Sequence, residues 1–453
     1  MDFTARKARK DLSADALFKR LRTRFDQVPD VRSGTVGISM GDALMSAFAM
    51  FSLKDPSLLA FDRRRQDPDN NLNLRTVYGI VRPPCDSQMR AILDPVEPVH
   101  MRPPFRDVFR CLQRGKALEA FAYLDGHYLV SLDGTGYFSS STIQCSSCLV
   151  KHHRNGSDTY SHQMLGAVLV HPDRKEVIPL APEPIIKADG DIKNECERNA
   201  TRRWLKLFRQ DHPHLPIIVV EDGLAANAPH LRDLREANAR FIIGVKAGDH
   251  AFLFNHLHEA DEAGRTQTLT TVDAATGILR HYRFHRDAPL NESNPDMLVH
   301  VLEYWEIHPA RIVKGVQRAG KVLYFSWITG FVLTPDNVYD IMRGGRARWK
   351  VENETFNTLK NQGYNLEHNY GHGDKNLSVV LAMLMMLAFL VDQSQQASCP
   401  LFQAALKKRG AKCSLWELIR IYFKAYVFDS MTALLEAIVR GIKPMQPILC
   451  DST

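Results

Sequence analysis

The stretch from residue 128 to 246 constrains the fold most, because its hydrophobic pattern changes period in a fixed order. Short β-rich runs alternate with amphipathic helical runs, and the order is strand, strand, strand, helix, strand, helix, strand. These segments cover 128–138, 162–172, 176–185, 196–210, 216–222, 228–238 and 240–246. The first three strands can pair as an antiparallel meander, whereas helical crossovers imply parallel neighbours. The sequence therefore predicts an α/β core built on a mixed sheet.

The chain of 453 residues is longer than a single hydrophobic core usually organises, so several regions are expected. We predict a helical N-terminal region suited to DNA binding, a core in two parts, a β-rich insertion between those parts, and a helical C-terminal region. The predicted boundaries are 1–115, 116–247, 248–335 (the insertion), 336–395 and 396–453. The apolar run 377–391 is shorter than the ~18 residues that span a membrane, so it is expected to be a buried helix.

The composition indicates an ordinary globular protein. Hydrophobic residues make up 45% of the chain and charged residues 24%, which excludes a mainly disordered protein. The net charge of +7 is compatible with a nucleic-acid partner without requiring one. The N-terminus lacks the apolar segment of a secretory signal, and the eight cysteines are expected to be reduced thiols in the cytoplasm.

Positive charge is densest at the N-terminus. The first 24 residues hold eight Lys or Arg against three Asp, and apolar residues recur among them near helical spacing. Two interpretations stay open for this basic amphipathic helix: a solvated face on a bundle helix, or a contact to the DNA backbone. The proposed DNA-binding residues are Arg6, Lys7, Arg9 and Lys10.

Three carboxylates stand where phosphodiester chemistry would need them. Asp133 and Asp222 each end a predicted strand and precede a glycine, which lets the backbone turn away and leaves the carboxylate open. Glu352 lies in a predicted helix, RARWKVENETFNTLK, on the face that carries Phe356 and Leu359. Oxygen ligands of this kind suit Mg²⁺ or Mn²⁺. Taken singly, each acid is also compatible with a surface or capping role.

Two neighbouring acids are excluded from this set by direction. Glu221 precedes Asp222 on a strand and is expected to point to the opposite face of the sheet. Glu354 is expected to lie on the solvated side of the helix that carries Glu352. The candidate metal ligands are therefore Asp133, Asp222 and Glu352.

These residues also carry a family resemblance. The segments SLDGTGYFSS, IIVVEDGLAANAPH and RARWKVENETFNTLKNQGYNLEHNYGHG resemble the three catalytic blocks of bacterial insertion-sequence transposases of the DDE type. The resemblance implies an RNase H-like core with Asp133, Asp222 and Glu352 as the catalytic acids, and with Arg348 and Lys360 as accompanying basic residues. Where the family has Tyr and Lys, this chain has Gly345 and Leu359.

The resemblance implies an activity and its partners. The expected reaction is Mg²⁺-dependent hydrolysis at element ends, which frees a 3′-hydroxyl that then attacks target DNA. The expected partner is double-stranded DNA, bound by a homodimer in the bacterial cytoplasm at the nucleoid. Two alternatives remain: an RNase H-like nuclease without strand transfer, and a non-catalytic, domesticated DNA-binding protein.

A cysteine and histidine cluster, CSSCLVKHHRNGSDTYSH, follows the first carboxylate. Cys145 and Cys148 form a Cys-x-x-Cys pair that can chelate Zn²⁺, and His153 is the histidine nominated with them. The adjacent His152, or His162 or Cys196, could instead complete a tetrahedron. The alternative interpretation is a polar loop with reduced thiols.

Overall fold

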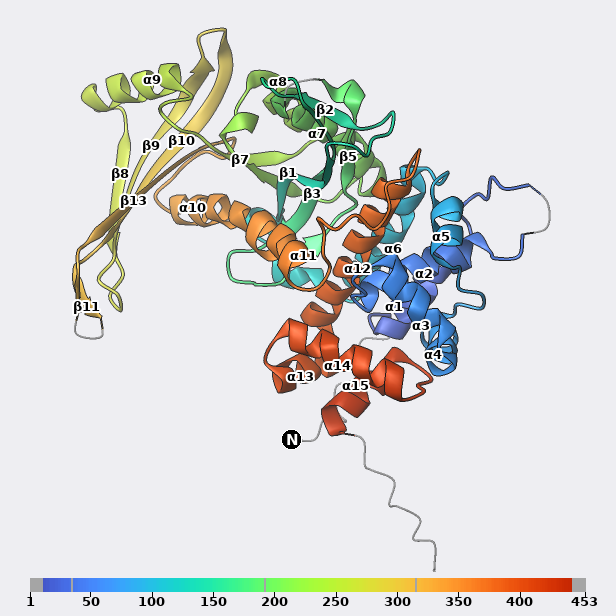
Figure 1. The fold of residues 1–453 in the computed structure, drawn as a ribbon. Helices are drawn as coiled ribbons and strands as arrows, with labels where there is room; N and C mark the ends of the chain where they lie inside the picture. Colours follow the sequence, from blue (N-terminus) through green and yellow to red (C-terminus); the bar gives the residue numbers. More distant parts are fainter. Residues whose placement is uncertain (1–10, 34–35, 191–192, 314–315, 442–453) are drawn as a thin grey trace, which may run out of the picture.

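A computed structural model describes residues 11–33, 36–190, 193–313 and 316–441 of the chain. One large mixed sheet and a separate body of helices make up most of it (Figure 1). The main strand order in the sheet is β2-β3-β1-β6-β7-β13-β10-β9-β8. The molecule is therefore of the mixed α/β class that the sequence predicts.

The centre of the sheet has the predicted order of elements, with one further short strand, β2, between the first two predicted strands. β1 pairs antiparallel with β3 and parallel with β6, and β6 pairs parallel with β7. α7 packs against β1 and β3, and α8 packs against β7. The bounds are β1 (Tyr128–Ser140), β2 (Leu149–His152), β3 (Asp158–Val170), β4 (Ile178–Pro179), β5 (Glu183–Ile185), α7 (Lys193–Asp211), β6 (Ile217–Glu221), α8 (Ala228–Glu236) and β7 (Arg240–Gly244).

Two sequence-based details of this region are wrong. The first strand does not end at Asp133, as the glycine after it indicated, but runs on to Ser140, because β3 pairs with it along its whole length across a bulge after Gly136. The third predicted run is split into β4 and β5, which both pair with β3. Asp133 therefore lies inside a strand rather than at its end.

The segment after β7 lengthens the same sheet. β13 pairs antiparallel with β7, and β10, β9 and β8 follow outward to form an arm that extends away from the core (Figure 1). The helix α9, which the β-leaning pattern did not predict, packs on β9. The bounds are α9 (Ala251–Glu262), β8 (Gln267–Val272), β9 (Leu279–Asn291), β10 (Asn294–His308), β11 (Arg311–Val313), β12 (Val316–Arg318) and β13 (Lys321–Thr329).

Helices from both ends of the chain share one body, blue and red in Figure 1. The long helix α12 (Leu377–Ser398) runs through it and contacts α2 (Met40–Ser52), α5 (Asp86–Leu93) and α6 (Arg102–Arg114). The other members are α1 (Ala14–Phe25), α3 (Leu58–Gln66), α4 (Pro68–Tyr78), α13 (Pro400–Arg409), α14 (Lys412–Ala425) and α15 (Met431–Arg440). By length and composition α12 could cross a membrane, but 89% of its apolar window is buried inside the protein, as expected for a core helix.

The described part of the basic N-terminal segment belongs to this body. Leu17, Leu21 and Phe25 of α1 are fully buried, and Arg22 and Arg24 form ion pairs with acids of α2 and α6. These residues therefore follow the bundle-helix interpretation. Arg6, Lys7, Arg9 and Lys10 lie outside the described residues.

The segment around Glu352 is not the single regular helix that the sequence suggests. α10 (Val338–Arg346) passes into a 3₁₀ turn, η7 (Ala347–Trp349), then into a π-helical turn, η8 (Val351–Phe356), and finally into α11 (Asn357–Asn361). Single π-helical turns are rare and are frequent at functional sites. The change of helix type alters which side chains face the sheet. Val351, Thr355 and Phe356 are buried, whereas the side chain of Glu352, which was expected on the same face as Phe356, is 47% exposed.

Candidate active site

Asp133 lies on β1, and Asp222 directly follows the neighbouring parallel strand β6. The pairing of β1 with β6 ends at Ser131 opposite Val220. Continuing this register by two residues sets Asp133 opposite Asp222, and adjacent strands are about 4.8 Å apart. Because β6 ends at Glu221, its pairing with β1 stops there within the described residues, and both aspartates line one small depression at this edge. The two aspartates nominated from the sequence are therefore brought together.

Glu352 reaches this edge because the π-turn η8 packs on β1 and β3. Phe356, four residues after Glu352, lies over Gly166, which pairs directly with Asp133. The hydroxyl of Ser131 also donates a hydrogen bond to the carbonyl oxygen of Arg348, at 3.0 Å. A glycine on β3 and a serine on β1 thus fix the backbone that carries Glu352 beside Asp133.

Arg348 connects two of the three acids. Its Nη1 lies 2.7 Å from Oε1 of Glu352 and 3.8 Å from Oδ2 of Asp133. Only 16% of its side chain is exposed, so the guanidinium is held within the site. The basic residue that the resemblance associates with the glutamate therefore contacts both acids.

The acids at this edge repel one another. Burial first, and then the charges of Glu352, Glu197 and Asp222, together raise the pKa of Asp133 to about 7, against the opposing charge of Arg348. Mutual repulsion of this kind is relieved by a bound divalent cation, and Mg²⁺ is bound mainly by oxygen ligands. The donor set therefore fits Mg²⁺ or Mn²⁺.

Glu197 is a fourth acidic side chain at this edge, and sequence reasoning missed it. It lies on α7 against Gly134, and it lines the same small depression as Asp133 and Asp222. A signal was present, because Glu197 shares a helical face with the buried Thr201, Trp204 and Phe208. An acid in line with an apolar face points inward.

The surroundings of Gly345 explain why this chain has glycine where the family has tyrosine. A Cβ at this position would lie 2.6 Å from Cε2 of Trp327, so the indole of β13 fills the space beside α10. Trp327 is 5% exposed. A larger residue at position 345 is therefore excluded by the tryptophan that stands against it.

The remaining nominated or excluded residues have definite places. Lys360 pairs with Glu367 at 2.7 Å, and its role at the catalytic acids stays a prediction. Glu221 lies 2.6 Å from Nε2 of His230 on α8, and it also lines the small depression that holds Asp133 and Asp222. Glu354 is half-buried rather than solvated.

A cleft of about 780 Å³ adjoins the acids. The cleft is lined by Asp222 and Arg348, which belong to the site of the acids. It is also lined by the basic residues Lys246 and Arg346. Aromatic rings complete it, among them Trp349, which is 55% exposed. Basic groups attract phosphates and exposed rings can stack on bases, so the cleft has the chemistry of a nucleic-acid groove.

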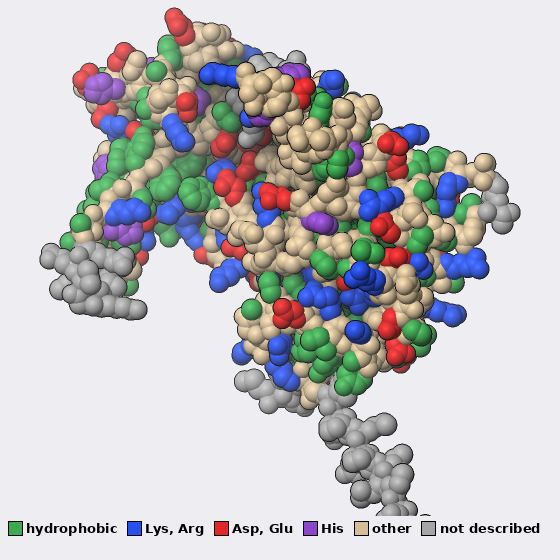
Figure 2. Space-filling view, viewed as in Figure 1, with side chains coloured by type: hydrophobic (Ala, Val, Ile, Leu, Met, Phe, Trp, Pro, Cys, Tyr) green, Lys and Arg blue, Asp and Glu red, His purple; other side chains and the backbone are tan. Residues whose placement is uncertain are grey.

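The charge on the visible face is uneven. Lys and Arg side chains gather over the helical body, whereas hydrophobic side chains gather on the arm of β8, β9, β10 and β13 (Figure 2). The outline is hollowed between the arm and the helical body. The helical body therefore offers a basic surface beyond the cleft.

The Cys-x-x-Cys pair has different partners from those nominated. Cys145 and Cys148 lie beside His162 of β3 and His372, which precedes α12. His153 lies outside this group, because the β2–β3 hairpin carries it to an exposed position where its Nε2 is 2.8 Å from Oγ1 of Thr159. Cys196 is on α7, where its thiol donates to the carbonyl oxygen of Gly190.

Comparison with known families agrees with this geometry. The family described as "Transposase DDE domain" matches residues 150–390, more than half of the chain, so the protein belongs to the DDE transposases. The matched region contains Asp222 and Glu352 and begins after Asp133. No curated protein matches the chain. As a member of this family the chain is a transposase with an RNase H-like domain, and its substrate is DNA.

Proposed function

We propose that this transposase cuts DNA at the ends of an insertion sequence and joins the freed 3′ ends to target DNA. One observation carries the proposal: Asp133, Asp222 and Glu352 come from segments far apart in the chain and meet at one sheet edge, next to a basic cleft. Both steps are displacements at phosphorus, so one site can serve both.

The residues of the site have different roles in this proposal. Asp133, Asp222 and Glu352 would hold two Mg²⁺ or Mn²⁺ ions, which activate an attacking oxygen and stabilise a leaving one. Arg348 orients Glu352 and limits the repulsion between Glu352 and Asp133. Glu197 adds negative charge to the same edge.

The cleft supplies DNA contacts in this proposal. Lys246 and Arg346, which line the cleft, would meet phosphates, and the exposed indole of Trp349 would stack on a base near the scissile bond. Because the reaction joins two element ends to one target, the proposal includes a homodimer bound to DNA.

The test is a cleavage and joining assay with the full-length protein, Mg²⁺ and DNA that carries the element's terminal repeats. The expected products are nicked or cut ends with a 3′-hydroxyl, and covalent joints between those ends and a target plasmid. A matched substrate with randomised terminal repeats is the control.

The alternatives predict other outcomes. A nuclease without strand transfer would cut, yet it would fail to join ends supplied already cleaved with a free 3′-hydroxyl. A non-catalytic DNA-binding protein would bind the repeats and neither cut nor join. Either result contradicts the proposal.

A further inference from the structure

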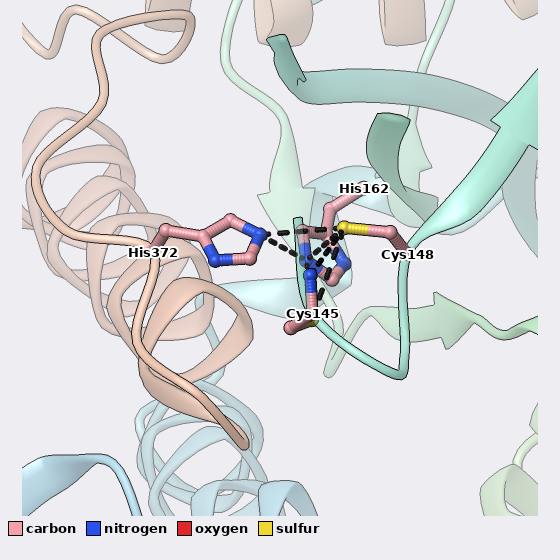
Figure 3. A group of neighbouring side chains, drawn as sticks. All are labelled: Cys145, Cys148, His162 and His372. Atoms are coloured by element: carbon pink, nitrogen blue, oxygen red, sulfur yellow. Dashed lines mark hydrogen bonds between the residues drawn. The ribbon is translucent and has the colours of Figure 1, made fainter. Parts of the chain in front are cut away.

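Four side chains from three separate parts of the chain converge between the sheet and α12 (Figure 3). Cys145 and Cys148 belong to the loop between β1 and β2, His162 belongs to β3, and His372 belongs to the loop between α11 and α12. Their ligand atoms all lie within 4.8 Å of one another. Cys148, His162 and His372 are buried.

The spacing of these atoms is that of a tetrahedron around a zinc ion. With Zn–S of about 2.3 Å and Zn–N of about 2.05 Å, tetrahedral geometry requires about 3.8 Å between sulfurs, about 3.6 Å between sulfur and nitrogen, and about 3.3 Å between nitrogens. The two Sγ atoms are 3.8 Å apart, and the two Nε2 atoms are 3.2 Å apart. The S···N separations are 3.5 Å for Cys145 with His162, 3.5 Å for Cys148 with His162, and 3.3 Å for Cys148 with His372.

The surroundings orient the ligands as a metal would need. Nδ1 of His372 donates to the carbonyl oxygen of Gly373 at 2.8 Å, which leaves the lone pair of Nε2 directed at the cluster. The backbone N–H of Cys145 points at Sγ of Cys148, at 3.4 Å. Phe138 packs against both imidazoles and shields them from solvent.

The chemistry of the donors selects the ion. The group contains two sulfurs and two imidazole nitrogens and no oxygen, a set that suits Zn²⁺ and not Mg²⁺. Four protein ligands leave no open position for water or substrate, which is the pattern of a structural site.

We propose that Cys145, Cys148, His162 and His372 bind one structural Zn²⁺ ion. The ion would hold the segment 362–376, which follows the helix of Glu352, against β3 and the loop between β1 and β2. On the other side, Asp94 already holds this segment by accepting from the backbone N–H groups of Asp374 and Lys375. Zinc would therefore set where α12 begins and restrain the end of the third catalytic segment.

The first test measures metal in the intact protein. Full-length protein purified without chelator should contain about one zinc per chain, measured by mass spectrometry of the metals. Replacement of that zinc by Co²⁺ should give the visible absorption of a tetrahedral site and an ultraviolet thiolate-to-metal band. Folded protein that stays below about a tenth of an equivalent after incubation with Zn²⁺ would overturn the proposal.

The second test uses variants with matched controls. Cys148→Ser and His372→Ala should lose at least about tenfold in zinc content, whereas His372→Cys, which keeps a donor, should retain zinc. His153→Ala and Cys413→Ser remove the same side-chain types outside the cluster and should retain one zinc. Full zinc in the double variant Cys145→Ser/Cys148→Ser would contradict the assignment.

A third measurement separates this site from the catalytic acids. Asp133→Asn should keep its zinc while losing cleavage, so the two proposals fail independently. Zinc removal from the wild-type protein should increase amide exchange in residues 362–376 more than in β6 and β7. Unchanged exchange across 362–376 would show that the ion does not fasten this segment.

Discussion

The ring of Phe356 occupies the space that a side chain at Gly166 would fill. A Cβ at Gly166 would lie 2.7 Å from Cε1 and Cζ of that ring. Since Gly166 pairs with Asp133, this contact sets how closely the turn that carries Glu352 approaches the first aspartate. The close approach of the turn that carries Glu352 to the strand that carries Asp133 therefore depends on glycine, which has no side chain, at position 166.

Gly166→Ala should displace the π-turn and lower cleavage at least tenfold. Overpacking at such a contact typically costs about 1–3 kcal/mol, measurable by urea unfolding. Gly136→Ala is the matched control, because a Cβ there meets nothing within 4 Å. Wild-type cleavage by Gly166→Ala would show that the contact does not position Glu352.

Asp133→Asn, Asp222→Asn and Glu352→Gln should each abolish cleavage while folding and DNA binding persist. Any two of these changes together should cost little more than one alone, because a single site is lost each time. Glu354→Gln, on the same turn, should cut normally. Near-normal cleavage by one of the three variants would remove that residue from the site.

The raised pKa of Asp133 predicts how stability depends on pH without Mg²⁺. Between about pH 4 and pH 7 the folded carboxyl keeps a proton that the unfolded chain has released, so stability should fall as pH rises through this window. At pH 8 Asp133→Asn should be more stable than wild type by roughly 1–3 kcal/mol, after allowance for partial exposure, and the difference should vanish near pH 4. Urea unfolding at the two pH values in Mg²⁺-free buffer measures this, and no change with pH would contradict it.

Arg348 should control the pH at which Mg²⁺ activates the enzyme. Its charge lowers the pKa of Asp133, so Arg348→Gln should raise that pKa and let a proton compete with the metal at higher pH. The Mg²⁺ concentration for half-maximal cleavage should therefore rise most below pH 8. Arg343→Gln, whose ion pair with Asp173 lies elsewhere, should leave the profile unchanged.

The N-terminal charges should govern DNA affinity. Each phosphate contact changes the slope of log affinity against log salt by about 0.9, so replacing Arg6, Lys7, Arg9 and Lys10 by Gln should flatten the slope by a few units. Equal loss for terminal-repeat and random DNA would identify backbone contacts alone. An unchanged slope would place the binding surface elsewhere, for instance around Lys407, Lys408 and Arg409 at the end of α13.

Part of the site could be predicted from the sequence, and part could not. Asp133 and Asp222 could be paired in advance, because alternating strands and helices imply parallel neighbours whose ends meet at one edge. His372 could not be joined to Cys148 in this way, because 224 residues separate them and no periodic pattern links them. His153 is closer to Cys148 along the chain, but in the β2–β3 hairpin its side chain contacts Thr159 and lies outside the cluster.

The sequence by itself determined the order of strands and helices in the core and the burial of α12, because hydrophobic periodicity acts over a few residues. Only the tertiary structure decided how these elements combine. The insertion became an extension of the sheet through β13 and β7, and Asp15 near the N-terminus came to accept hydrogen bonds from Met431 and Thr432 at the start of α15. Such contacts join residues from 83 to more than 400 positions apart, so they follow from the packing of whole elements and leave no local mark in the sequence.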